Sequence, residues 1–284
     1  MGIERTVADS KGKGFGELPN ETNTKTKSKK SRRRQKKMPP PPPPPPTVQK
    51  LFNTCKEVFA SGRPGHIPPP QDIEKLKSVL DAMKPEDVGV NPEMPFFRSS
   101  QGRRLQRITY LHIFECEKFS MGIFCLPPSG VIPLHNHPEM TVFSKLLFGT
   151  MHIKSYDWVT DLPADIPTSI KPSSETAFQP EVRLARVKAD ADFTAPCNPS
   201  ILYPADGGNM HCFTAVNACA VLDVLGPPYS DPDGRHCQYY HDYPFSKFSV
   251  EGSSIPEEER KGYAWLQERE KPEDLEVIGR MYSP

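Results

Sequence analysis

Apolar residues recur at helical spacing in two short stretches, and this spacing predicts amphipathic helices because residues three and four apart share a helix face. The first stretch ends before Gly62 and contains Val48, Leu51, Phe52, Cys55, Val58 and Phe59. The second follows Pro70, ends before Pro85 and contains Ile73, Leu76, Val79, Leu80 and Met83. We therefore expect two short helices before the main body of the chain.

Beyond Pro95 the apolar spacing changes to two, in short segments separated by turns rich in proline and glycine. After residues 108–116 the segments are MGIFCLP, MTVFSKLLFG, MHIKSYDW, VRLARVKAD, MHCFTAV and AVLDVLG. Many short strands without intervening helices are typical of a sandwich or a barrel. Near the end of the chain, PEEERKGYAWLQERE predicts a polar helix and is followed by LEVIGRMY; we expect both to pack against the outside of the barrel.

Composition changes the picture at the N-terminus. The chain has 284 residues with 34 prolines, and residues 39–46 form an unbroken proline run. Residues 25–37 contain nine lysines and arginines, no acid and no hydrophobic residue, so this segment repels itself and buries nothing. The proline run favours an extended spacer. We therefore predict a disordered, basic and proline-rich tail over residues 1–46 and one folded domain over residues 47–284.

The basic tail is open to three interpretations. Its clusters KSKK and RRRQKK are typical of a nuclear import signal. Its cations would also attract phosphate backbones weakly and without sequence preference. A solvated tail without any partner is the third interpretation. No aromatic residue lies between the cations, so recognition of bases by stacking is not supported.

Several classes of protein are not expected from this sequence. No run of about 18 apolar residues is present, and the first residues lack the apolar core of a secretory signal. The seven cysteines are odd in number, scattered and without a CxxC pair, which argues against a disulfide framework or a structural zinc site. We therefore expect a protein that neither spans a membrane nor is secreted, in a reducing compartment.

Three histidines form a candidate metal site. His135 and His137 are two residues apart, so on a strand both would face one side, and His211 opens another apolar strand. An HxH pair by itself is more often a surface or hydrogen-bonded pair than a ligand pair. The glycines Gly130 and Gly149 around it, however, resemble the first cupin motif, and the stretch GGNMH ending at His211 resembles the second.

The expected cupin glutamate is missing from this pattern. The position carries Val142 with Thr141 beside it, neither of which binds iron or zinc, and Glu139 is a weak substitute. Three neutral imidazoles would leave a divalent metal with its full charge and about three open positions. Such a site suits a thiolate that binds before dioxygen. Spacing alone leaves iron, zinc, manganese and nickel open.

A more specific resemblance covers most of the chain from about Leu51 to Tyr282. The strings SGVIPLHNHPEMTVFSKLLFGTMHIKSYDW, YPADGGNMHCFTAVNACAVLDVLGPPYS and GRHCQYYHDYPF resemble those of plant cysteine oxidases, thiol dioxygenases related to animal cysteamine dioxygenase. The resemblance implies a mainly β fold: a cupin-type double-stranded β-helix (jelly-roll) barrel with short N-terminal helices. It also implies Fe(2+) held by His135, His137 and His211, with O2 as co-substrate.

The same resemblance implies a function. Enzymes of this kind oxidise the thiol of an N-terminal cysteine on a protein to the sulfinic acid and so mark the protein for the N-degron pathway. Their targets include ethylene-response transcription factors, which makes the activity an oxygen sensor in hypoxia signalling. Asp223, Tyr229 and Cys237 match positions treated in the family as active-site residues outside the metal ligands.

These three residues also have an interpretation of their own. Asp223 interrupts the apolar strand AVLDVLG, and a buried carboxylate is costly unless a cation or a hydrogen bond compensates it. The ammonium group of an incoming cysteine would supply the cation; a structural hydrogen bond to the backbone is the alternative. Tyr229 follows a rigid Gly-Pro-Pro loop and can line the pocket. Cys237 and Tyr239 are two apart, and whether they form a thioether crosslink stays open.

The other histidines receive structural interpretations: we place His112 and His152 on strands, and His66, His236 and His241 in loops. The leading hypothesis is a protein-cysteine dioxygenase, monomeric, in nucleus and cytoplasm, without membrane or nucleic-acid partners. Dioxygenation of a small thiol such as cysteamine or free cysteine is the enzymatic alternative. A metal-binding cupin without catalytic activity, tethered to nucleic acid by its basic tail, is the alternative from another class.

Overall fold

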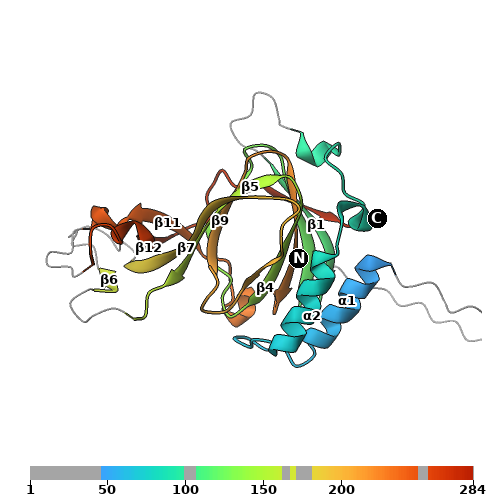
Figure 1. Ribbon diagram of the computed structural model, residues 1–284, viewed down its shortest axis with the longest axis horizontal. Coiled ribbons are helices and arrows are strands. Elements are labelled where there is room, and N and C mark those ends of the chain that lie inside the picture. Colours follow the sequence, from blue (N-terminus) through green and yellow to red (C-terminus); the bar gives the residue numbers. More distant parts are fainter. Residues whose placement is uncertain (1–45, 99–106, 162–166, 171–180, 249–254, 284) are drawn as a thin grey trace, which may run out of the picture. The chain divides into compact units, whose positions relative to one another are not determined.

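The computed structural model describes residues 46–98, 107–161, 167–170, 181–248 and 255–283 (Figure 1). The predicted tail over residues 1–46 lies almost entirely outside these ranges. Among the described residues, no helix has the length and apolar character that crossing a bilayer requires.

The two helices predicted from the apolar spacing are confirmed. They are α1 (Thr47–Val58) and α2 (Pro70–Asp81), which lie side by side in Figure 1. Pro70 occupies the first turn of α2, where a missing N–H costs nothing. The buried faces of both helices share one apolar cluster with residues of β1, β2, β4 and β10. Lys145 of β4 donates to Asp81 of α2 at 2.9 Å and so ties the second helix to the strands.

Two sheets form the body of the molecule. The first runs in the order β13-β1-β2-β10-β4-β8 and the second in the order β12-β11-β3-β9-β5-β7-β6. The first sheet comprises β1 (Ile108–Glu115), β2 (Ser120–Leu126), β4 (Thr141–Phe148), β8 (Ser200–Leu202), β10 (Cys219–Gly226) and β13 (Val277–Met281). The second comprises β3 (Val131–His135), β5 (Thr150–Trp158), β6 (Ser169–Ile170), β7 (Val182–Thr194), β9 (Met210–Ala215), β11 (Tyr239–Pro244) and β12 (Tyr263–Arg269).

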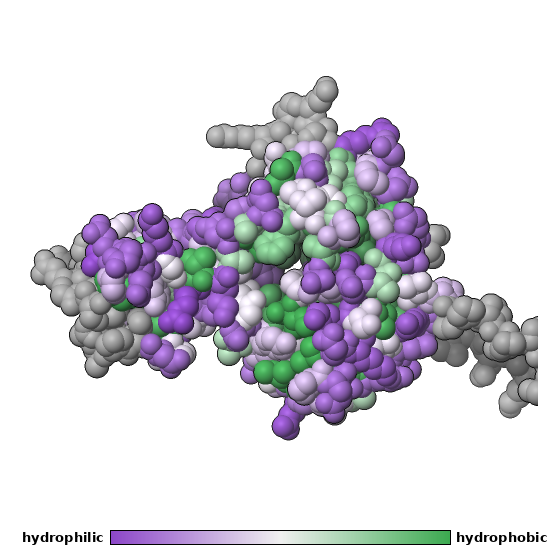
Figure 2. All heavy atoms as spheres, viewed as in Figure 1, coloured by the Kyte–Doolittle hydropathy of each residue, from purple (hydrophilic) through white to green (hydrophobic). Residues whose placement is uncertain are grey.

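The strand order confirms the expected jelly-roll barrel. Strands β2, β10, β4 and β8 neighbour one another in one sheet, while β3, β9, β5 and β7 do so in the other. From β2 to β5 and from β8 to β10, successive strands therefore alternate between the two sheets, as in a double-stranded β-helix. An additional β12–β7 pairing closes β12, β11, β3, β9, β5 and β7 into a ring of antiparallel strands. The body is hollowed between the sheets, and apolar residues surround the hollow on the face shown in Figure 2.

Short 3-10 helices make up the remaining regular structure. They are η1 (Pro85–Val88), η2 (Pro95–Phe97), η3 (Asp231–Asp233), η4 (Phe245–Lys247) and η5 (Arg260–Gly262).

The C-terminal helix predicted from PEEERKGYAWLQERE is wrong. Only the turn η5 forms in its described part, and the segment continues as strand β12, which pairs with β11 on one side and β7 on the other. Trp265 of β12 is fully buried and donates its indole N–H to the Phe245 carbonyl at 3.1 Å. Pairing with two distant strands outweighs a local preference for helix. The loop position expected for His241 is also wrong, since this residue lies on β11.

Candidate metal centre and its cavity

Three buried histidines converge between the two sheets. His135 ends β3, His211 lies on β9, and the two are direct register partners across the β3–β9 pair. The strand ends before His137. The expectation that His135 and His137 lie on one continuous strand is therefore wrong. The three rings still approach one another, with centroids 4.7 to 5.0 Å apart.

Asn209 holds His137 in place where the strand no longer does. Its side-chain oxygen accepts from the His137 N–H at 3.0 Å, and its side-chain nitrogen donates to the His137 carbonyl at 2.9 Å. The same nitrogen donates to the Tyr203 carbonyl at 2.8 Å. Because Asn209 stands two residues before His211, this buried amide connects the two ligand segments directly. The stretch GGNMH contains this residue, but its sequence does not reveal which backbone groups the amide binds.

Hydrogen bonds on the outer side of the rings define their tautomers. His135 donates from Nδ1 to the Pro133 carbonyl at 2.8 Å. The Tyr229 hydroxyl donates to the Asn136 carbonyl at 2.7 Å, so its oxygen is free to accept from Nδ1 of His137 at 3.0 Å. His211 makes a backbone hydrogen bond with Gly208. In His135 and His137, Nδ1 therefore carries the proton, and Nε2 presents a lone pair.

These lone pairs fit a metal cation. The Nε2 atoms of His137 and His211 are 3.3 Å apart, and one ligand atom from each of the three histidines lies within 4.8 Å of the others, so all three can bind a single cation. Burial lowers the pKa of all three imidazoles, and the neighbouring rings lower the pKa of His137 and His211 further. Neutral imidazoles with an outward Nδ1–H bond are typical metal ligands.

No carboxylate of the described residues joins this group. Within those ranges, the cluster of potential ligands contains His135, His137 and His211 alone. Glu139 is exposed and has a positive φ of 57°, and Val142 is buried in an apolar cluster. The donor set is thus three neutral nitrogens, as the sequence predicted.

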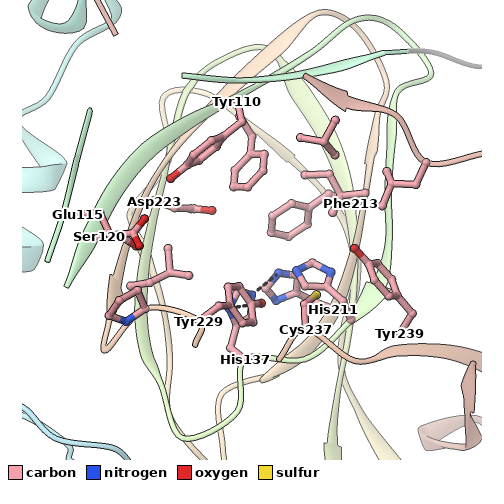
Figure 3. A pocket seen from close by; sticks show the side chains of 17 residues that line it. Tyr110, Glu115, Ser120, His137, His211, Phe213, Asp223, Tyr229, Cys237 and Tyr239 are labelled. Carbon is pink, nitrogen blue, oxygen red and sulfur yellow. Dashed lines mark hydrogen bonds between the residues drawn. The ribbon is translucent and has the colours of Figure 1, made fainter. Parts of the chain in front are cut away.

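A cavity of about 390 Å³ opens onto the histidines (Figure 3). It is lined by Tyr110, Glu115, Ser120, Phe124, Ile132, His135, His137, His211, Phe213, Asp223, Leu225, Pro228, Tyr229, Cys237, Tyr239, Leu275 and Val277. All six predicted site residues are among them. In the part of the chain that the structure describes, this lining has two carboxylates and neither lysine nor arginine.

Asp223 contributes one of the carboxylates from the middle of β10. It is 5% exposed, and burial raises its pKa from 3.8 to about 7, against a hydrogen bond from Ser144 that lowers it. Its Oδ1 atom is buried without a hydrogen-bond partner among the described residues. A buried carboxylate oxygen without a partner is costly in a folded protein. This atom is therefore a ready acceptor for a cationic group in the cavity.

Cys237 lies between two phenols. Its thiol hydrogen-bonds with Tyr239 and Tyr229, and burial raises its pKa, so the thiol is neutral at ordinary pH. The Tyr239 backbone pairs with His135 and so links β11 to β3.

Figure 3 shows Tyr229, Cys237 and Tyr239 near the histidines, with Asp223 and Tyr110 across the cavity.

Tyr110 is a cavity residue that the sequence analysis missed. Its ring lies across Gly122 of β2, where any Cβ would overlap it, and Gly122 is the register partner of Asp223. The Tyr110 pKa is raised to about 12, first by burial and then by the charges of Asp223 and Glu115. A glycine inside a strand pattern often marks such a close approach, so Gly122 was the available signal.

Comparisons with known proteins agree with this geometry. The PCO_ADO family model matches residues 79–284. Plant cysteine oxidase 2 of Arabidopsis thaliana is 68% identical over 237 residues, which cover 83% of this chain and 81% of the relative. Plant cysteine oxidase 1 of the same plant is 60% identical over 242 residues, covering 83% and 78%. The human 2-aminoethanethiol dioxygenase is 33% identical over 220 residues, covering 75% and 80%.

Proposed function

The chain belongs to the PCO_ADO family and is a cysteine thiol dioxygenase, and from this premise we propose that its substrate is the N-terminal cysteine of a protein. The reaction adds both atoms of O2 to the sulfur, so that RSH and O2 give the sulfinic acid RSO2H with no other reductant. Similarity to two plant cysteine oxidases supports this substrate over a small thiol.

The observation that carries the proposal is the charge pattern of the cavity. An N-terminal cysteine of a protein brings a thiol and an ammonium group but no carboxylate. Asp223 offers the ammonium group a buried acceptor that has no partner among the described residues. Free cysteine would add a carboxylate to a lining whose described residues include no lysine or arginine, so its binding is disfavoured.

The size of the cavity favours a peptide over cysteamine. A volume of about 390 Å³ lies in the range of roughly 300 to 1,000 Å³ that encloses drug-sized ligands. Cysteamine carries the same thiol and ammonium groups but would fill only a small part of it. The apolar lining residues Phe124, Ile132 and Leu275 would then make no contact with the ligand.

We assign the metal to Fe(2+), held by His135, His137 and His211, because dioxygenation requires a metal that activates O2. When bound, iron would activate O2 toward the thiolate sulfur. Tyr229 keeps the His137 ring in its ligating tautomer, Asp223 holds the substrate ammonium, and Cys237 with Tyr239 borders the space beside the histidines. Asn209 fixes the distance between the two ligand segments.

The biological role follows from the chemistry of the product. A sulfinic acid at the N-terminus would mark the target for the N-degron pathway, so that targets such as ethylene-response transcription factors persist only when O2 is scarce. We propose nucleus and cytoplasm as the sites of action, since the basic clusters of residues 25–37 are typical of an import signal. The alternative of a cupin without catalytic activity is not retained, because the relatives are oxidases and dioxygenases.

Mass spectrometry tests the substrate. Protein purified without oxygen and loaded with Fe(2+) is mixed in air with an N-terminal-cysteine peptide, the same peptide with an acetylated N-terminus, cysteamine, or free cysteine. We expect a gain of two oxygen atoms on the free-amine peptide, with the highest kcat/KM of the four. Oxidation of cysteamine without oxidation of the peptide would refute the proposal, as would equal rates for the free and acetylated peptides.

A further inference from the structure

Strand β13 forms one edge of the first sheet, beside the cavity. It pairs in parallel with β1, and no other strand in the described parts of the chain pairs with its outer side. The strand is exposed along most of its length: Val277 is 40% exposed and Met281 is 77% exposed. An exposed edge with free backbone groups is a template for a further strand.

The hydrogen bonds of β13 show which backbone groups are free. Ile108 of β1 donates to the Glu276 carbonyl, and Tyr282 donates to the His112 carbonyl. In a strand, successive residues direct their N–H and C=O groups to opposite sides. The even-numbered residues from 276 to 282 therefore face β1. Val277, Gly279 and Met281 direct their backbone groups to the open side.

This open side begins at the active-site cavity. Leu275 and Val277 line the cavity, so the first free backbone groups of β13 stand at its rim. The other end of the strand borders a second hollow of about 400 Å³, where Arg280, Met281 and Tyr282 meet apolar residues that include Met94 and Phe96. The strand thus connects the reaction site with a partly apolar hollow about 13 Å further on, at about 3.3 Å per residue.

We propose that β13 binds the peptide that follows the N-terminal cysteine, as an added parallel strand. This inference rests on the proposed function, because it needs a protein substrate with its cysteine in the cavity. The chain leaving the cavity passes Val277 and continues toward Met281, with backbone hydrogen bonds to Val277, Gly279 and Met281. Main-chain pairing of this kind gives affinity without requiring a fixed sequence.

The proposal defines a substrate class. A target must present an extended N-terminal segment of about five residues, because a folded N-terminus cannot lie along a strand. An apolar side chain that reaches the second hollow would add affinity by burial. Dipeptides and cysteamine would be oxidised without any use of β13.

Gly279→Pro tests the pairing. Proline removes an N–H that points away from β1, and proline is tolerated on an edge strand when its missing N–H faces outward. We expect the KM of an eight-residue N-terminal-cysteine peptide to rise about three- to tenfold, the loss of one net hydrogen bond. The KM of a Cys-Gly dipeptide amide should change less than about twofold. Gly279→Ala keeps the N–H and has open space for its methyl group, so it should retain the peptide KM.

A change in the substrate gives the same test without altering the protein. Methylating one backbone nitrogen at a time in residues 2–6 of the peptide removes one donor at each position. Pairing with β13 predicts an alternating pattern, in which every second methyl group raises KM and the others have little effect. A ligand held only by side chains would not show this alternation.

The outcomes separate this inference from the proposed function. If neither peptide is oxidised, the proposed function fails. If both peptides are oxidised, yet Gly279→Pro and the methylation series leave the KM of the longer peptide unchanged, binding along β13 is refuted while the proposed function stands. An equal rise in KM for the long peptide and the dipeptide would also refute it, since that result indicates a disturbed cavity.

Discussion

Asp223 and Gly122 face each other across the β2–β10 pair, and the ring of Tyr110 occupies the space that the missing Gly122 side chain leaves. A phenol and a carboxylate from two different strands are thereby brought to the same wall of the cavity. Gly122, which has no side chain, therefore determines where the Tyr110 ring lies beside Asp223.

The first prediction concerns this packing. Gly122→Ala places a methyl group where the Tyr110 ring now lies, so the ring must move into the cavity. We expect a fold with similar helix and strand content but a kcat/KM for the cysteine peptide lowered about tenfold or more. Steady-state kinetics measure it, with Gly262→Ala as control because its added methyl group meets no neighbour. Equal kinetics for wild type and Gly122→Ala would contradict the role given to Tyr110.

The second prediction is that Asp223 lowers the stability of the folded protein although it contributes to activity. The pKa of this carboxyl is raised from 3.8 to about 7, so the folded state holds its proton more tightly than the unfolded state does. Stability therefore falls as pH rises from about 4 to 7, because over this range the unfolded state releases a proton that the folded state retains. Asp223→Asn should stabilise the metal-free protein at pH 8 by up to about 4 kcal/mol and hardly at all at pH 4. Chemical unfolding at both pH values measures this difference.

The same variant should lose activity while it gains stability. The asparagine amide in Asp223→Asn offers no charge to the substrate ammonium group, so we expect a raised KM for the cysteine peptide with metal content unchanged. In wild type, kcat/KM should decline below about pH 7, where Asp223 takes up its proton. A variant that is both less stable at pH 8 and fully active would show that Asp223 has a structural role instead.

Removal of one imidazole should abolish metal retention. His211→Ala leaves two ring nitrogens where the cavity now has three, and we expect both bound iron and turnover to fall below about one-tenth of wild type. Metal analysis of anaerobically purified protein provides the measurement. Asp223→Asn is the matched comparison, because it changes the same cavity but no potential ligand. Stoichiometric iron in His211→Ala would rule out the proposed ligand set.

Tyr229→Phe probes the tautomer of His137. The variant loses a hydroxyl group whose O–H donates to the Asn136 carbonyl and whose oxygen accepts from Nδ1 of His137. We expect metal affinity or activity to fall about 10- to 100-fold while the barrel remains folded. Titration with Co(2+) and its visible absorption report the ligand field directly. Tyr243→Phe removes a phenol oxygen elsewhere, on β11, and serves as control; similar Co(2+) affinity for both variants would argue against this role.

The last prediction lies outside the cavity. His152 is held between Asp192 at 2.7 Å and Asp190 at 2.9 Å, and these carboxylates raise its pKa, Asp192 most strongly. A raised pKa means that the stabilisation is present below about pH 6.5 and is lost as pH rises through the folded value. His152→Asn should lower the free energy of unfolding at pH 5.5 by under about 1 kcal/mol, because the pair is partly exposed, and should leave it unchanged at pH 9, as measured by chemical unfolding at both pH values. An equal loss at both pH values would exclude the ionic contribution.

Local sequence patterns were sufficient to predict the helices, most strands and the candidate ligands of this protein. The apolar spacing of residues 48–83 predicts both helices, because an amphipathic helix needs only one apolar stripe to pack against its neighbour. The alternation after residue 95 predicts the strands, and HxH with the later GGNMH predicts the three histidines. The acid within the apolar segment AVLDVLG also identifies Asp223, since burying a carboxylate costs free energy unless a cation or a hydrogen bond compensates it.

Tertiary structure decided what these patterns could not encode. The segment YAWLQER becomes a strand because β11, the preceding strand, and β7, much earlier in the chain, both supply its hydrogen bonds. The hydrogen bonds of Asn209 with His137 and the packing of the Tyr110 ring over Gly122 likewise join residues from different parts of the chain. Sequence periodicity determines which face of an element is apolar, but register between distant strands determines which polar atoms meet. In this chain the ligand types come from local motifs, and their geometry comes from contacts across the barrel.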